Sequence, residues 1–387
     1  MLDLIYLDTC STTKPRQEVV ELMYKSLKED YGNPSSLHRL GLSSEKKIKK
    51  AREIISDFLK VDPNEIFFTS GGTESNNIAI QSIIKKYSRN ANHIITTKVE
   101  HPSVLNVMKR YESQGFEVSY LDTDDKGQID LEDLKNSITD KTSLISLIHV
   151  NNEIGIIQDI KSVKDIINKS KSKALLHLDG VQSFGKIDFN LRSLGVDTYS
   201  FSGHKVYGPK GVGGLYINKR LKLDPIIFGG SQEFGLRSGT ENLTGIIGFG
   251  QAVQILSKNY KAEAKHAREL KEYMVEKHKE EIIDFKVNTT LDGRSSPYIL
   301  SISYEDVRGE VLLHYLEEKE IYVSTSSACS SKGTEKSHVL KAIKLRDNEI
   351  EGTIRYCFSH DIKKDDIDYT VGVLKESVEE IRSIIRR

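Results

Sequence analysis

This sequence has few cysteines, no net charge and no long apolar run, and each of these absences excludes a class of protein. The three cysteines, Cys10, Cys329 and Cys357, are far apart in the sequence and form no C-x-x-C pair, which excludes a disulfide framework. Lysine plus arginine and aspartate plus glutamate both number 56, so no net charge attracts the chain to nucleic acid or a lipid surface. No apolar run reaches the roughly 20 residues that span a bilayer, and the N-terminal MLDLIYLDTC lacks the basic segment of a signal peptide. We therefore expect a globular cytoplasmic protein that contacts neither nucleic acid nor membrane.

The order of strand-like and helical segments favours an α/β fold. Between about residues 64 and 217, short β-branched or aromatic runs alternate with helix-length segments, which predicts a mostly parallel sheet with helices on both faces. The expected strands of this sheet are 66–70, 93–99, 117–122, 143–150, 174–179, 196–202 and 213–218.

A long charged segment at 252–282 predicts a helix that marks the boundary to a second domain. The segments after it favour a smaller α+β domain and are 298–304, 307–320, 351–359 and 364–386. We therefore predict a large domain over 15–255 and a small domain over 256–387, with the N-terminal segment 1–14 packing on the small one.

Two glycines in FTSGGTESNN (68–77) suggest an anion site. The strand ends at Gly71-Gly72, and Thr73 then opens a helical stretch. Glycine lets the backbone approach a ligand closely, and free N–H groups at a helix start attract an anion. An ordinary strand-to-helix turn with a Thr or Ser cap explains the same residues.

The segment HLDGVQ (177–182) puts a carboxylate at the end of a buried strand. Such a carboxylate needs a partner, and the carboxyl ends of parallel strands are where ligands bind. Asp179 is therefore a candidate to hold a protonated heterocyclic nitrogen, with Gln182 reaching the same ligand. The alternative is that Asp179 caps the following helix.

The stretch SFSGHKVYGPKGVGG (200–214) is the most specific signal. Ser202 and His204 precede Lys205 in a tight, glycine-flanked turn after a strand. A lysine held there and partly desolvated has a lowered pKa, so its free amine can condense with an aldehyde. Asp179 and Lys205 each follow a strand, which is compatible with one cleft for both.

Four further side chains fit the same cleft. His101 follows a strand and can stack on a flat ring or carry protons, although a lone histidine is more often structural. Asn152 stands at another strand end, and Thr240 is in a polar turn suited to phosphate. Arg355, in an apolar strand, needs a carboxylate partner and shares a face with Cys357.

Together these residues call for a planar, phosphate-bearing aldehyde and a carboxylate substrate. Pyridoxal phosphate with an amino acid meets each demand. Asp179 would pair with the pyridine nitrogen, and His101 would stack on the ring face. The turn at Gly72-Thr73 would bind the phosphate, and Lys205 would condense with the aldehyde.

In this order the motifs resemble the class I cysteine desulfurases, the NifS/IscS-like branch of the class-V aminotransferase family. The motifs extend from YLD (6–8) to IDYT (367–370) and include YGNPSSLH, FTSGGTESNN, EHPSV, VNNEIG, HLDGVQ, SFSGHKVYGPKG, LRSGTEN and SSAC. The resemblance implies the fold of the fold-type I pyridoxal-phosphate transferases: a large domain with a mostly parallel seven-stranded sheet and a smaller α+β C-terminal domain.

The resemblance also implies a role for each site residue. Lys205 binds the cofactor aldehyde and is catalytic together with His101 and with Cys329, the nucleophile. The implied cofactor-binding residues are Gly72, Thr73, His101, Asn152, Asp179, Gln182, Ser202, His204, Lys205 and Thr240, the last reaching the partner's cofactor in a homodimer. Arg355 and Asn152 bind the substrate. No resident metal is implied, although Cys329 could transiently ligate a nascent iron–sulfur cluster.

The implied reaction converts L-cysteine to L-alanine and leaves the sulfur as a persulfide on Cys329. An acceptor protein then takes the sulfur for iron–sulfur cluster assembly or for tRNA and cofactor thiolation. Selenocysteine lyase, another pyridoxal-phosphate lyase or an aminotransferase is the alternative enzyme. A catalytically retired scaffold or sulfur-carrier partner is the alternative outside enzymes.

The chain departs from the family pattern at several positions. Phe234 and His360 stand where arginine is common, and Ser326 stands where glycine is frequent. We also expect no extended tail for a scaffold protein after the last predicted helix. These departures favour a dedicated sulfur acceptor. Cys10 and Cys357 are predicted to be small packed residues.

Overall fold

The protein is a computed structural model that describes residues 4–87, 91–325 and 336–385. Its largest sheet has seven strands in the order β2-β8-β7-β6-β5-β3-β4. Only β8 runs antiparallel to its neighbours, so the predicted mostly parallel sheet is confirmed. The strands are β2 (Ile66–Thr69), β3 (His93–Thr97), β4 (Glu117–Leu121), β5 (Thr142–Ile148), β6 (Leu175–Asp179), β7 (Thr198–Ser202) and β8 (Gly213–Ile217).

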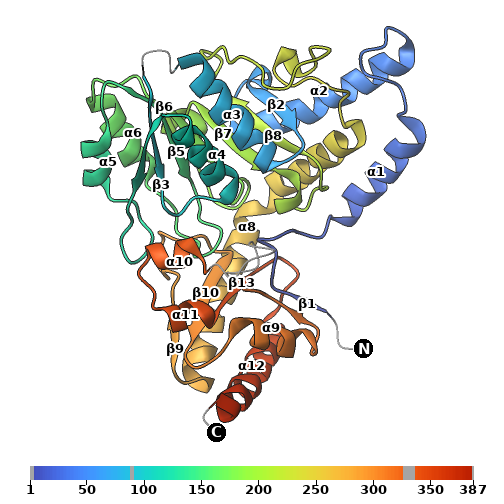
Figure 1. Cartoon of the computed structure of the whole chain (residues 1–387). Coiled ribbons are helices and arrows are strands. Elements are labelled where there is room, and N and C mark those ends of the chain that lie inside the picture. The colour runs from blue at the N-terminus through green and yellow to red at the C-terminus, as the bar shows by residue number, and fades with distance from the viewer. Residues whose placement is uncertain (1–3, 88–90, 326–335, 386–387) are drawn as a thin grey trace.

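Helices cover both faces of this sheet, so that strands such as β3, β5 and β7 are buried on both sides. On β3, Ile95 joins the apolar cluster of one face, and its neighbour Ile94 joins that of the other. The first face is covered by α2 (Arg39–Leu59), α5 (Leu131–Ser137), α6 (Ile160–Lys169), α7 (Leu191–Leu194) and the start of α8. The second face is covered by α3 (Gly72–Tyr87) and α4 (Pro102–Ser113) (Figure 1).

The large sheet and its covering helices form the first layer of the molecule. A second layer, made of smaller sheets and further helices, lies below it in Figure 1. Its sheet has the order β12-β13-β10-β9, and a separate two-stranded sheet pairs β1 with β11. The strands are β1 (Ile5–Tyr6), β9 (Phe285–Val287), β10 (Ile299–Tyr304), β11 (Ile321–Tyr322), β12 (Ser324–Thr325) and β13 (Thr353–Cys357). The helices are α9 (Gly309–Glu317), α10 (His338–Ala342), α11 (Asp347–Glu351) and α12 (Lys364–Ile385).

The helix α8 (Leu243–Glu281) joins the two layers, and α1 (Gln17–Glu29) packs beside it. Leu243 and Leu256 of α8 belong to the core of the large sheet, whereas Ala267 and Met274 belong to the core of the second layer. The N-terminal segment adds Ile5, Leu7 and Cys10 to this second core. The division of the chain at 255/256 stays a prediction.

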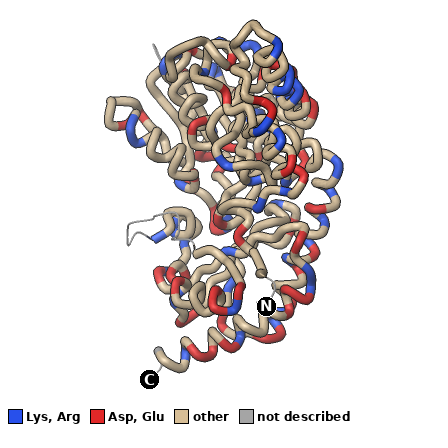
Figure 2. Tube along the Cα trace, turned by 90° about the vertical axis from the view of Figure 1, so that its right-hand side faces the viewer, with Lys and Arg blue, Asp and Glu red and all other residues tan. Residues whose placement is uncertain are grey.

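Charged residues of both signs are interspersed along the trace (Figure 2), in keeping with the zero net charge. In the described ranges, every helix is too short or too polar to cross a bilayer. Those ranges also contain no grouping of three or more His, Cys, Asp or Glu side chains that would suit a metal ion.

Candidate active site

A cavity of about 280 Å³ lies where β5, β6 and β7 end and where the N-terminal segment and β13 meet them. Most of the predicted site residues line it: Gly72, Thr73, His101, Asn152, Asp179, Gln182, Ser202, His204, Lys205 and Arg355. Thr240 does not line this cavity and is exposed, and Cys329 lies outside the described residues.

Lys205 ends a single helical turn, Gly203–Lys205, that directly follows β7. Its Nζ donates hydrogen bonds to the backbone carbonyls of Cys10 and Ser11, the latter at 2.9 Å. The lysine therefore reaches across the cavity to the N-terminal segment, which holds its amine at a fixed point.

Asp179 is the last residue of β6 and is almost fully buried. Its Oδ2 accepts a hydrogen bond from Asn76 Nδ2 at 2.8 Å, and its Oδ1 accepts one from the Val181 N–H at 3.0 Å. The carboxylate thus supports the following turn and still lines the cavity, so the two alternatives for Asp179 are compatible. Asn76, on α3, is a positioning residue that sequence reasoning missed.

His101 caps the N-terminus of α4, and Pro102 occupies the first helical position. Its Nδ1 accepts a hydrogen bond from the Ser103 N–H at 3.1 Å, which leaves the proton of the neutral ring on Nε2. Burial lowers the pKa of His101, and the charge of Lys205 acts in the same direction against the opposing charge of Asp179. The ring is therefore mostly neutral near pH 7.

The start of α3 and the end of β7 together form an anion cradle. Helix α3 begins at Gly72, where a Cβ atom would lie only 2.4 Å from Val181 Cγ2. Ser202 Oγ is buried and has no hydrogen-bond partner among the described residues. A buried hydroxyl costs free energy unless it is hydrogen-bonded, and free N–H groups at a helix start favour an anion. This cradle suits a phosphate group.

Arg355, in the middle of β13, binds three groups around the cavity. Its guanidinium donates to Asp8 Oδ1 and to Ser11 Oγ, each at 2.8 Å, and to the Asn152 carbonyl at 2.9 Å. Its Nε is buried and has no partner among the described residues. The carboxylate partner expected for Arg355 is thus Asp8, the last residue of the YLD motif, for which the sequence predicted no role.

Both flanks of the segment that contains Cys329 are fastened near this cavity. On one side, Ser324 of β12 pairs with Arg355. On the other side, the Ser337 hydroxyl donates to Glu153 Oε2 at 2.6 Å, and His338 Nε2 donates to the Glu100 carbonyl at 2.8 Å.

The same architecture and sequence occur in known proteins. The family model for class-V aminotransferases matches residues 5–370. A protein named cysteine desulfurase IscS from Dictyoglomus turgidum is 43% identical over 380 residues, which cover 98% of this chain and 96% of that relative. The chain belongs to the class-V aminotransferase family. Another cysteine desulfurase IscS, from Clostridium botulinum, is 38% identical over 98% of this chain and 96% of that relative. A solved structure titled NifS-like protein superposes with a TM-score of 0.92 at 37% identity and covers 97% of this chain and 100% of that one.

Members of this family use pyridoxal phosphate. The cavity fits this cofactor because it combines three features. These are a phosphate cradle whose Ser202 hydroxyl has no partner in the part of the chain that the structure describes, a buried carboxylate at Asp179 and the amine of Lys205. His204 stands next to the cradle with its Nδ1 3.2 Å from Thr12 Oγ1. Burial, reinforced by nearby lysines, lowers the pKa of His204 to about 4, so its ring is neutral beside the amine.

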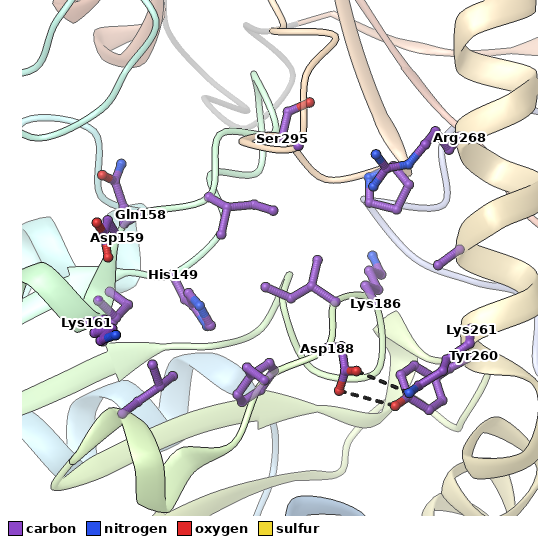
Figure 3. Close-up of a pocket in the computed structure, with 18 of the residues that line it drawn as sticks. His149, Gln158, Asp159, Lys161, Lys186, Asp188, Tyr260, Lys261, Arg268 and Ser295 are labelled. Carbon is purple, nitrogen blue, oxygen red and sulfur yellow. Dashed lines mark hydrogen bonds and ion pairs between the residues drawn. The ribbon is translucent and has the colours of Figure 1, made fainter.

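A larger cavity of about 640 Å³ lies between the two layers (Figure 3). None of the predicted site residues lines it. Asp188 there pairs with Lys261 at 3.2 Å and accepts from the Tyr260 hydroxyl at 3.3 Å. Lys186 connects the two cavities, because it lines the larger one and its ammonium donates to Gln182 Oε1 of the smaller one at 2.8 Å.

Glu100, next to His101 in the chain, should make the stability of the protein depend on pH. Burial raises the pKa of Glu100 to about 8, despite hydrogen bonds from the Ile148 N–H and the Thr97 hydroxyl. Between the unfolded pKa and about pH 8, the native state keeps a proton that the unfolded state has lost, so the free energy of unfolding falls as pH rises through this window. Glu100→Gln removes this loss. The difference in unfolding free energy between the Glu100→Gln variant and the parent should therefore shift in favour of the variant by about 2 to 4 kcal/mol between pH 5 and pH 9.

Urea unfolding at a series of pH values measures this difference. Glu132→Gln, on the exposed face of α5, is the matched control and should follow the parent curve. A Glu100→Gln difference that is the same at pH 5 and pH 9 would contradict the expectation.

Proposed function

We propose that this chain is a cysteine desulfurase that converts L-cysteine to L-alanine and retains the sulfur as a persulfide on Cys329. The observation that carries the proposal is one cavity lined by Lys205, Asp179, His101 and Arg355. The described residues on either side of Cys329 are bonded close to it, since Ser324 pairs with Arg355 and Ser337 binds Glu153. The names of the relatives, cysteine desulfurase IscS, support the same reaction.

The chain's own groups hold the cofactor and substrate. The α3 start at Gly72-Thr73 and Ser202 bind the phosphate, and Asp179 pairs with the pyridine nitrogen. When bound, pyridoxal phosphate supplies an electron sink beside the substrate Cα. Arg355 donates to the substrate carboxylate from the position where it already binds Asp8.

Two groups move the proton. Lys205 Nζ, once it is neutral, takes the proton from the substrate Cα. His101 faces the same cavity with its proton on Nε2, which makes this nitrogen a donor while Nδ1 is occupied by the Ser103 N–H. Lys205 is therefore the base, and His101 assists as a neutral donor.

Cys329 performs the sulfur transfer. Its thiolate forms a bond to the substrate sulfur, the Cβ–S bond breaks, and Cβ takes up a proton to become the methyl group of alanine. The net change is L-cysteine plus enzyme thiol to L-alanine plus enzyme persulfide. No external oxidant is needed.

The proposed assembly is a cytoplasmic homodimer that hands sulfur to an acceptor protein. Thr240 is exposed in the single chain, on the segment before α8, and we propose that it contacts the phosphate in the partner's cavity. The acceptor serves iron–sulfur assembly or tRNA and cofactor thiolation, and Cys329 could transiently ligate a nascent cluster on the way.

Incubation of the purified holoenzyme with L-cysteine, followed by intact-mass analysis and alanine assay, tests the proposal. We expect a gain of one sulfur atom that maps to the Cys329 peptide, with L-alanine as the product. A keto acid in place of alanine would indicate an aminotransferase. Turnover of selenocysteine but not of cysteine would indicate a selenocysteine lyase. A colourless protein without activity would indicate a retired scaffold. Each of these three results would overturn the proposal.

A further inference from the structure

The larger cavity, of about 640 Å³, lies outside the site described above and is formed by segments of both layers. One side consists of the start of α6, with Lys161, and the segment 186–189 after β6. The other side consists of the middle of α8, with Arg268, and the segment 293–297 (Figure 3). A cavity of this size is in the range of small-molecule sites, and a ligand in it would contact both layers.

Basic residues outnumber acidic ones around this cavity by five to two. Both acidic side chains are already engaged, because Asp188 pairs with Lys261 at 3.2 Å and Asp159 caps the start of α6. Lys161 and Arg268, by contrast, are exposed and form no ion pair within the described ranges. The excess of positive charge therefore attracts an anion to this cavity.

Lys186 is the buried basic residue of this cavity. Only 6% of Lys186 is exposed, and its ammonium binds a neutral group, the Gln182 amide oxygen, at 2.8 Å. In the part of the chain that the structure describes, no carboxylate pairs with this ammonium. A buried charge without a counter-charge is costly in free energy. An anion in the cavity would therefore stabilise the Lys186 ammonium.

The cavity also has an apolar part. Ile160, Ile187 and Phe189 line it, and the ring of Phe189 lies edge to face with that of His149 at a centroid distance of 5.0 Å. Burial lowers the pKa of His149 to about 4, so this ring is neutral and adds no charge. The cavity therefore offers flat, uncharged surface to the organic part of a ligand, next to the basic groups that attract its charges.

We propose that this cavity binds a polyphosphate group, carried either by an inorganic polyphosphate or by a nucleotide. Phosphate oxygens accept hydrogen bonds from ammonium groups, and the Arg268 guanidinium can bind two of these oxygens at once. A polyphosphate carries several negative charges along its length, which matches basic groups that come from both layers. In a nucleotide, the ring would lie on the apolar part beside Phe189. The binding does not depend on the reaction proposed above.

Isothermal titration calorimetry of the holoenzyme tests the proposal, with inorganic tripolyphosphate and adenosine triphosphate as separate probes. The holoenzyme is used because its cofactor already occupies the phosphate cradle of the smaller cavity. We expect saturable binding of at least one probe, at one site per chain. Tighter binding of adenosine triphosphate would assign the site to a nucleotide, and tighter or equal binding of tripolyphosphate would assign it to an inorganic polyphosphate. Citrate, a polyanion without phosphate, should bind more weakly than the better probe.

Two double variants locate the binding. Lys161→Gln with Arg268→Gln removes one positive charge from α6 and one from α8, and should weaken binding of the better probe by about tenfold or more. Lys169→Gln with Lys279→Gln is the matched control, because it removes two exposed lysines of the same helices that do not line the cavity. This control should keep the parent affinity, and melting curves establish that both variants are folded.

Three results would overturn the proposal. The first is a parent protein that binds neither probe saturably. The second is an equal affinity of the two double variants for the better probe, which would place the binding outside the cavity. The third is citrate binding as tight as that of the better probe, which would show attraction of any polyanion and no site for phosphate.

Discussion

Replacement of Lys205 with alanine should reduce alanine formation from L-cysteine by on the order of 10⁴-fold, the upper end of what a positioned acid–base group contributes. Lys205 is the amine in the cavity whose position is fixed at two points, by the carbonyls of Cys10 and Ser11. His101 cannot replace it, because the one basic nitrogen of its neutral ring, Nδ1, already accepts the Ser103 N–H. The measurement is initial-rate alanine formation at saturating cysteine.

Lys210→Ala is the matched control for this experiment. Lys210 lies five residues further along the same turn segment and is exposed, so the parent rate should be retained. Borohydride reduction should attach the cofactor to the parent and to Lys210→Ala, but not to Lys205→Ala. A Lys205→Ala protein that kept more than a tenth of the parent rate would show that another base acts.

The large sheet could be predicted from the sequence because its strands are apolar and regularly spaced. The seven predicted strands are confirmed close to their expected bounds, from β2 (Ile66–Thr69) to β8 (Gly213–Ile217). A polar residue at the end of such a strand is easy to find, and Asp179 at the end of β6 is an example. Elements such as β12 (Ser324–Thr325) and α10 (His338–Ala342) were not expected, because they are too short to show a period.

The site residues that the sequence did not reveal are those whose role depends on contacts between distant segments. Asp8 is 347 positions from Arg355, and no local pattern indicates that it binds this guanidinium at 2.8 Å. Asn76 follows the glycine turn on α3, but its contact with Asp179 requires the packing of α3 against the sheet. Local motifs therefore identify the groups that meet the cofactor, whereas tertiary packing determines which groups support them.

The packing of Cys10 and Cys357 agrees with what the sequence predicts for them. Each is a lone cysteine in its own stretch of sequence, which favours a small packed residue. Both are buried in the apolar core of the second layer, where the N-terminal segment lies along β13.

Replacement of Cys329 with alanine should reduce alanine formation by on the order of 10³-fold or more, because it removes the nucleophile that takes the substrate sulfur. The earlier proton step should survive, since Lys205, His101 and Arg355 are unchanged. In deuterated water, the Cys329→Ala holoenzyme should therefore still exchange the Cα proton of L-cysteine. Proton exchange measured by NMR and alanine formation measured in parallel separate the two steps.

Ser330→Ala, directly after Cys329, is the control that alters the segment and keeps the thiol. It should retain both exchange and alanine formation. If Cys329→Ala lost both readouts, the residue would be needed for binding or folding and not as the sulfur acceptor. If it retained alanine formation, the sulfur would leave without a protein nucleophile, and the persulfide step would be wrong. Exchange without alanine formation is the one outcome that assigns the sulfur transfer to Cys329 and the proton transfer to the groups of the cavity.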